Sequence, residues 1–123
     1  MSKFKVLSNI NDNLDKVIPD EICFFIDEKT TITEENMDRM AAEFKDPKIG
    51  FVYTDAVIKT EEYSFVEYLS GKDLPDIAFA MRVPEGITLE KVNGESKSLL
   101  MRQLAAYGLY FIHIADPLIE INE

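Results

Sequence analysis

A strand–helix–strand pattern between residues 21 and 55 constrains the fold of this chain more than any other feature. Residues 21–26 form a continuous run of apolar, β-forming side chains, and residues 49–53 form a second such run. Between the two runs, apolar side chains recur at helical spacing: Met37, Met40, Ala41 and Phe44. A crossover of this length predicts two parallel strands that are neighbours, or nearly neighbours, in one sheet. The pattern therefore predicts an α/β fold.

The predicted helix carries recognisable start and stop signals. Either Thr31 or Thr33 can cap its first turn, and Thr31 followed by Glu34 fits a capping box. The helix is expected to run to about Phe44, because Pro47 shortly afterwards cannot continue it.

Other elements are expected on both sides of this unit. They are a strand at residues 3–7, a turn and short helix at 8–18, a strand at 77–83, a helix at 95–107, a strand at 109–114 and an extended piece at 118–121. Residues 61–69 fit a strand or a short helix, because their apolar period does not decide between the two. Together these elements predict one α/β domain over residues 1–123, a small mixed sheet flanked by helices.

The charge of the chain limits the class of its partners. The formal net charge is −10 across 123 residues. Such a surface repels phosphate backbones and anionic lipid, so neither nucleic acid nor a membrane is expected as a partner. A net charge of this size usually keeps a protein soluble. The more specific interpretation is that it attracts a basic surface on another protein.

A lone cysteine and a lone histidine exclude several kinds of site. Cys23 is the single cysteine, so an intrachain disulfide is impossible, and its apolar surroundings predict a buried thiol. His113 lies in another apolar run and has no second His or Cys with which to share a metal, which favours a structural histidine.

The start of the chain lacks the apolar region of a signal peptide, and no run reaches the roughly 18 apolar residues of a membrane span. A reducing cytoplasm is therefore expected; for a virus-encoded chain this would be the host cytoplasm or the virion.

Three stretches, taken in order, resemble a known family. The first is Phe24-Phe25-Ile26-Asp27, then a helix, then Gly50-Phe51-Val52-Tyr53-Thr54-Asp55. The second is Ile77-Ala78-Phe79-Ala80-Met81-Arg82, and the third runs from Glu95 to Ile119 as an acidic helix start, a glycine and a strand. Together they resemble the Asp-x-Asp strand, the "vGlVYsD" strand, the acceptor-side strand and the acid-pair helix of family 2 glycosyltransferases, which have the GT-A fold. The resemblance covers about residues 4–121.

The resemblance also shows where this chain departs from the family. In the family, the Asp-x-Asp carboxylates bind a divalent metal that bridges the diphosphate of a sugar nucleotide. Here Asp27 is present, but Lys29 stands in place of the second carboxylate, and an ammonium opposes the binding of Mg²⁺ or Mn²⁺. At the acid pair, which supplies the family's catalytic base, the chain has Glu95-Ser96, so Glu95 would be the base of an active enzyme. Most of the family's nucleotide-binding half has no counterpart before the Asp27 strand.

These departures lead to the prediction of a non-catalytic, glycosyltransferase-like module that acts in protein binding or assembly. No cofactor is expected for it. Loss of the family's first strands would expose a sheet edge, which natural proteins cover, so a protein partner or a homo-oligomer is expected to cover it. A structural or accessory subunit, for instance of a virus, would fit this description.

Two other functions stay open. A small glycosyltransferase would bind Mn²⁺ or Mg²⁺ and a sugar nucleotide through Asp27, with Asp55 or Glu28 as further metal ligands. A carbohydrate-binding module would use an aromatic groove, for which the candidates are Tyr63, Tyr68 and Tyr107. Each feature also has a structural explanation: Asp27 and Asp55 can begin turns at strand ends, and the tyrosines can pack in the core.

Overall fold

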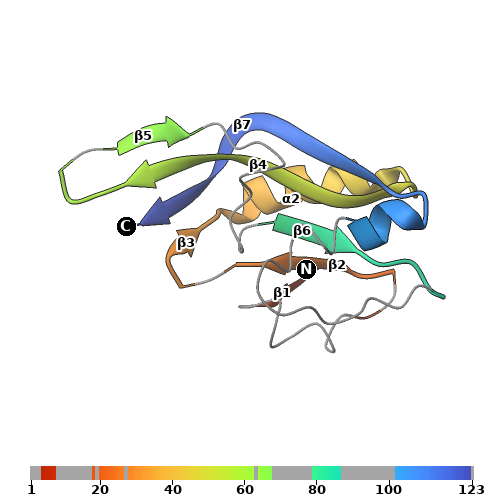
Figure 1. Ribbon diagram of the computed structural model, residues 1–123. Helices are drawn as coiled ribbons and strands as arrows, with labels where there is room; N and C mark the ends of the chain where they lie inside the picture. The colour runs from red at the N-terminus through yellow and green to blue at the C-terminus, as the bar shows by residue number, and fades with distance from the viewer. Residues whose placement is uncertain are drawn as a thin grey trace.

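The computed structural model describes residues 4–7, 18, 20–26, 28–62, 64–67, 79–86 and 102–122 (Figure 1). In these residues the protein has a mixed α/β fold dominated by one seven-stranded sheet. The strands are β1 (Phe4–Leu7), β2 (Ile22–Phe25), β3 (Thr30–Thr31), β4 (Ile49–Lys59), β5 (Ser64–Glu67), β6 (Phe79–Arg82) and β7 (Tyr110–Asn122). Helix α2 (Glu34–Ala42) is followed directly by the 3₁₀ turn η2 (Glu43–Lys45), and residues 102–106 are also helical.

The strand order separates the two strands of the predicted strand–helix–strand unit. The order is β1-β2-β6-β4-β7-β3, and β5 pairs with β4 outside this path. Strand β6 lies antiparallel to both β2 and β4, so β2 and β4 run in the same direction with β6 between them. The predicted parallel direction is thus confirmed. The two strands are not adjacent, because a strand from much later in the chain inserts between them.

Helix α2 begins as one of the two predicted caps requires. The Thr33 hydroxyl accepts a hydrogen bond from the backbone N–H of Asn36 at 3.1 Å. The capping box predicted from Thr31 is wrong, because Thr31 belongs to strand β3 and pairs with β7. Glu34 and Glu35 occupy the first turn of α2, where the helix dipole favours acidic side chains.

Strands β4 and β7 are longer than predicted. Strand β4 continues through Asp55 to Lys59, so Asp55 does not end a strand. Strand β7 continues through Asp116 and Pro117, where a break was expected. The register of the two strands shifts on both sides of Asp55, which faces Pro117. An irregularity of this kind accommodates a residue without an N–H inside a ladder.

The remaining predictions are partly tested. Residues 64–67 form strand β5, which decides the ambiguous segment in favour of a strand. Gly108 has φ 82°, and its N–H donates to the carbonyl of Ala105 at 2.9 Å, which confirms that the second helix ends there. The short helix predicted before Pro19 and the first part of the helix at 95–107 lie outside the described residues.

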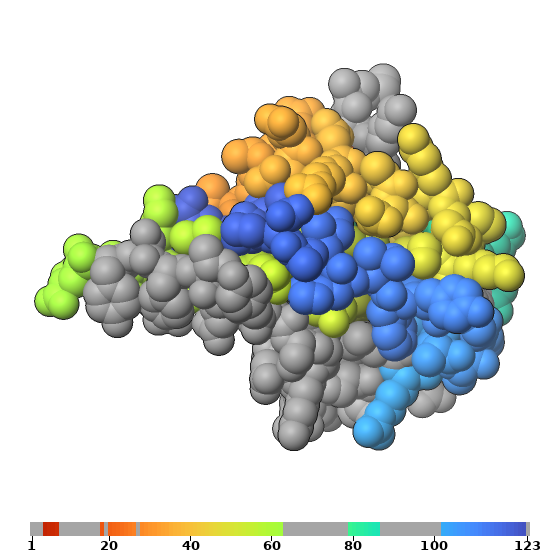
Figure 2. All heavy atoms as spheres, turned by 90° about the horizontal axis from the view of Figure 1, so that it is seen from above, coloured from red at the N-terminus to blue at the C-terminus, as the bar shows by residue number. Residues whose placement is uncertain are grey.

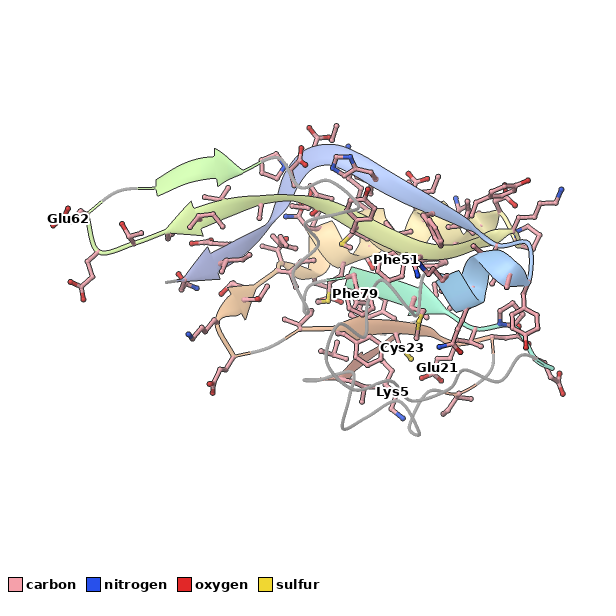
Figure 3. All side chains as sticks on the ribbon, in the orientation of Figure 1. Lys5, Glu21, Cys23, Phe51, Glu62 and Phe79 are labelled. Carbon is pink, nitrogen blue, oxygen red and sulfur yellow. The ribbon has the colours of Figure 1, made fainter. Side chains whose placement is uncertain are left out.

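The core has two layers, one on each face of the sheet. Helix α2 and η2 cover one face, where their side chains pack on the strands: Met40 and Phe44 contact a cluster that includes Phe24, Val52, Ala80, Ile114 and Leu118. On the other face, Phe79 stacks between Phe25 and Phe51, with ring centroids 5.2 and 4.6 Å apart (Figure 3). Cys23 is fully buried on this second face, as predicted. Burial of these aromatic rings stabilises the sheet against unfolding.

Arg82 connects strand β6 to the segment between α2 and β4. Its guanidinium donates to the backbone carbonyls of Phe44, Asp46 and Ile49 and lies 5.2 Å from the centre of the Phe44 ring. A planar group with several donors can serve three carbonyls at once. This side chain therefore holds the end of the α2–η2 segment against the centre of the sheet.

Strands β4 and β7 extend beyond helix α2 (Figures 1 and 2). We call the extension the arm and define it as residues 30–31, 56–62, 64–67 and 119–122, with Glu62 at its tip (Figure 3). We call the remainder the body: α2, η2, β1, β2, β6 and the first halves of β4 and β7. The arm has a small apolar cluster of its own, made by Ala56, Ile58 and Ile119 with Ile32 and Ile121 beside them.

Candidate functional site

A polar cluster lies where the body meets the arm. Tyr53 and Asp55 come from β4, and His113 comes from β7 in register with Tyr53. The Tyr53 and His113 rings stack with centroids 4.7 Å apart and planes 11° apart. The Nε2 atom of His113 lies 2.7 Å from Oδ1 of Asp55. Tyr53 belongs to the core cluster that includes Phe51, and Asp55 is brought beside it by the shared contact with His113.

Burial differs strongly within this cluster. The Asp55 side chain is 1% exposed, whereas the His113 side chain is 34% exposed. A carboxylate taken out of water needs a hydrogen-bonding partner, and the imidazole supplies one. The pair connects two neighbouring strands and leaves part of the histidine side chain exposed to solvent. Sequence reasoning predicted a structural or half-exposed His113 but did not predict its pairing with Asp55.

The cluster also perturbs its tyrosine. Burial raises the pKa of Tyr53, and the nearby charge of Asp55 raises it further. Tyr53 therefore stays a neutral phenol throughout the physiological range. Chemically, a buried carboxylate behind a partly exposed imidazole can orient that ring and assist proton transfer. The same arrangement also gives the buried acid a hydrogen-bonding partner at Oδ1, which is the structural role.

The predicted metal ligands are placed only in part. Asp55 directs Oδ1 at His113, and Glu28 lies with Lys29 in a turn after β2. The Lys29 carbonyl accepts a hydrogen bond from the backbone N–H of Asn122 at 2.8 Å, so this turn leads directly into the pairing of β3 with β7. Asp27 lies outside the described residues. Within the described ranges, no group of three or more His, Cys, Asp or Glu side chains could hold a metal ion.

Of the other predicted site residues, the structure describes Tyr107. Glu95, Tyr63 and Tyr68 lie outside the described residues. Tyr107 follows the helical residues 102–106 and is 54% exposed. Tyr110 is 58% exposed at the start of β7.

An apolar groove on the α2 side of the sheet was not predicted. It lies between α2, η2 and strands β1 and β2 and has a volume of about 570 Å³. We call it the α2 groove and define it by its lining residues: Phe4, Ile22, Glu34, Asp38, Ala41, Ala42, Phe44 and Lys45. The apolar stripe on α2 was evident from the sequence, but which strands lie under it depends on the sheet order.

Strand β1 extends the apolar surface beyond the groove. Phe4 pairs with Ile22 and Val6 pairs with Phe24, so Phe4 and Val6 share the face on which α2 packs. Val6 is 52% exposed. The apolar surface is therefore longer than the groove alone.

Comparison of the sequence with protein-family models and with curated proteins finds no match. In the part of the chain that the structure describes, no helix is long and apolar enough to cross a membrane.

Proposed function

We propose that this protein is a non-catalytic module that resembles family 2 glycosyltransferases and binds another protein at the α2 groove. The observation that carries the proposal is the groove itself, an apolar hollow between a helix and the end of the sheet. Exposed apolar surface with charged residues at its rim is typical of protein interaction sites. The continuation of this surface along β1 to Val6 favours a chain segment over a compact ligand.

The arrangement of the strands supports the resemblance on which the proposal depends. The stretches that resemble the family include β2, β6, β4 and β7, which are four consecutive strands in the sheet order. Distant parts of the sequence are thus brought together in one continuous unit. The departures at Lys29 and at Glu95-Ser96 support a module without the family's catalysis.

Selection from a random-peptide library tests whether the groove binds protein. The test variant is Ala41→Gln/Ala42→Gln, which fills the groove with neutral, helix-compatible side chains. The matched control is Ala105→Gln/Ala106→Gln, the same pair of changes on exposed residues of another helix. We expect selected peptides to bind the wild type and the control but not the groove variant. Peptides that bind all three proteins equally, or no enrichment at all, would overturn the proposal.

Calorimetric titration tests the catalytic alternative directly. Mn²⁺ and a panel of sugar nucleotides are added to the purified protein, and the protein's mass is followed by light scattering. The proposal expects no binding heat that depends on both the metal and the sugar nucleotide. Binding that disappears in Asp27→Ala would replace the proposed function with a glycosyltransferase.

A further inference from the structure

We infer that the α2 groove binds a cationic amphipathic helix. This inference rests on the proposed function, because it specifies the partner of the same groove. Five residues of the α2–η2 segment line the groove at spacings of four, three, one and three: Glu34, Asp38, Ala41, Ala42 and Lys45. Such spacings place them along one stripe of a helix. The groove therefore runs parallel to α2.

The opposite flank of α2 is attached to strand β7. Arg39 forms an ion pair with Asp116, and the Asn36 side-chain amide donates to the carbonyl of Leu118 at 2.9 Å. The cation in the last turn of α2 is thus engaged on the β7 side, across the sheet from β1 and β2. Glu34 and Asp38, one turn apart, are the charges that the helix presents along the groove.

The floor of the groove is apolar, and its wall on α2 carries small side chains. Phe4 and Ile22 contribute the floor from the sheet, and Phe44 contributes from η2. On α2 the wall is formed by Ala41 and Ala42, whose small side chains allow another backbone to approach closely. An amphipathic helix can lay its apolar face into a groove of this kind.

Charge sets the composition and the direction of the bound helix. The two acids lie toward the start of α2 and Lys45 lies at the other end, about 16 Å away at the rise of a helix. Lys or Arg side chains are therefore expected at the end of the bound helix beside Glu34. The net charge of −10 adds long-range attraction for a cationic partner and disfavours a second copy of this chain.

Two synthetic peptides test the inference. Both carry the same leucine stripe, and the polar positions are Lys in one peptide and Glu in the other. Fluorescence anisotropy measures their binding to the wild type, to Ala41→Gln/Ala42→Gln and to Glu34→Gln/Asp38→Gln. We expect the Lys peptide to bind the wild type at least about tenfold more tightly than the Glu peptide and to lose affinity as salt is added.

A charge-matched control separates the groove from the general acidity of the protein. Glu61→Gln/Glu62→Gln removes the same charge from the arm, where both residues are exposed. We expect Glu34→Gln/Asp38→Gln to weaken the Lys peptide about tenfold and the arm variant to have little effect. Far-UV circular dichroism establishes that each variant is folded before binding is measured.

The outcomes separate this inference from the proposed function. If both peptides bind equally, or if both charge variants weaken binding equally, the inference of a cationic helical partner is wrong. The proposed function still stands in that case if the peptides selected from the library need the groove for binding. Self-association that Ala41→Gln/Ala42→Gln abolishes would make a second copy the occupant and also overturn this inference. If neither library peptides nor synthetic helices need the groove, both proposals fail.

Discussion

The same two strands, β4 and β7, pass through the body and the arm, and their surroundings differ sharply. In the body, Val52 pairs with Ile112 beneath α2, and Phe51 lies against stacked aromatic rings on the opposite face. In the arm, Ile58 pairs with Ile121 over a small cluster of isoleucines and an alanine. The two strands pair with each other in both regions, on either side of the register shifts around Asp55, so the main difference between the regions lies in what covers the sheet.

This difference separates the contribution of strand pairing from the contribution of layered packing. Hydrophobic stabilisation scales with the apolar area removed from water, and two covered faces remove more area than one small cluster. Local opening draws on the regions with the least buried apolar surface. We therefore expect the arm to open more readily than the body. Four predictions test this comparison, in order of decreasing effect.

Phe51→Ala should have the largest effect, because it removes a fully buried ring from the aromatic stack of the body. We expect a loss of about 3–5 kcal/mol in the free energy of unfolding, measured by urea denaturation. A loss below about 1 kcal/mol would show that the body does not depend on this stack.

Ile58→Ala should remove about 2 kcal/mol, at the low end for such substitutions, because the arm cluster is small. Hydrogen exchange followed by mass spectrometry should show faster exchange at residues 56–59 and 119–122, with little change in β2 and β6. Equal acceleration in both regions would mean that the arm and the body unfold as one unit.

His113→Ala tests the polar cluster at the boundary between body and arm. The change removes a hydrogen-bonding partner from the buried Asp55 carboxylate. We expect a loss of about 1–2 kcal/mol, since the histidine side chain is partly exposed.

A double-mutant cycle with Asp55→Asn isolates this interaction. If the pair stabilises the fold, the two single changes should not be additive. Additive losses would show that Asp55 and His113 contribute independently.

The smallest effect is expected at alkaline pH. Burial raises the pKa of the Cys23 thiol, and the charge of Glu21 raises it further. A pKa raised in the folded state means that unfolding releases a proton once the pH exceeds the ordinary thiol value of about 8.5. Stability should therefore be constant below that pH and decline above it. Chemical denaturation from pH 7 to pH 10 measures the decline, which Cys23→Ala should flatten. An unchanged slope in this variant would assign the decline to other groups.

Local sequence patterns determined most of the secondary structure. Apolar runs predicted β1, β2, β6 and the start of β4, because side-chain alternation and β-propensity act between near neighbours in the chain. Thr33 marked the start of helix α2, and Gly108 marked the end of the helical residues 102–106. The net charge of −10 is likewise a property of the sequence alone.

The tertiary structure decided how these elements meet. The insertion of β6 between β2 and β4, the pairing of Asp55 with His113, and the groove between α2 and β1 all join residues far apart in the chain. Asp55 was expected at the start of a turn, but it lies inside β4, where the neighbouring β7 strand places the His113 imidazole 2.7 Å from its Oδ1. Strand order and register are set by long-range packing, which a local pattern does not encode. The elements followed from the sequence, whereas the candidate sites arose from their arrangement.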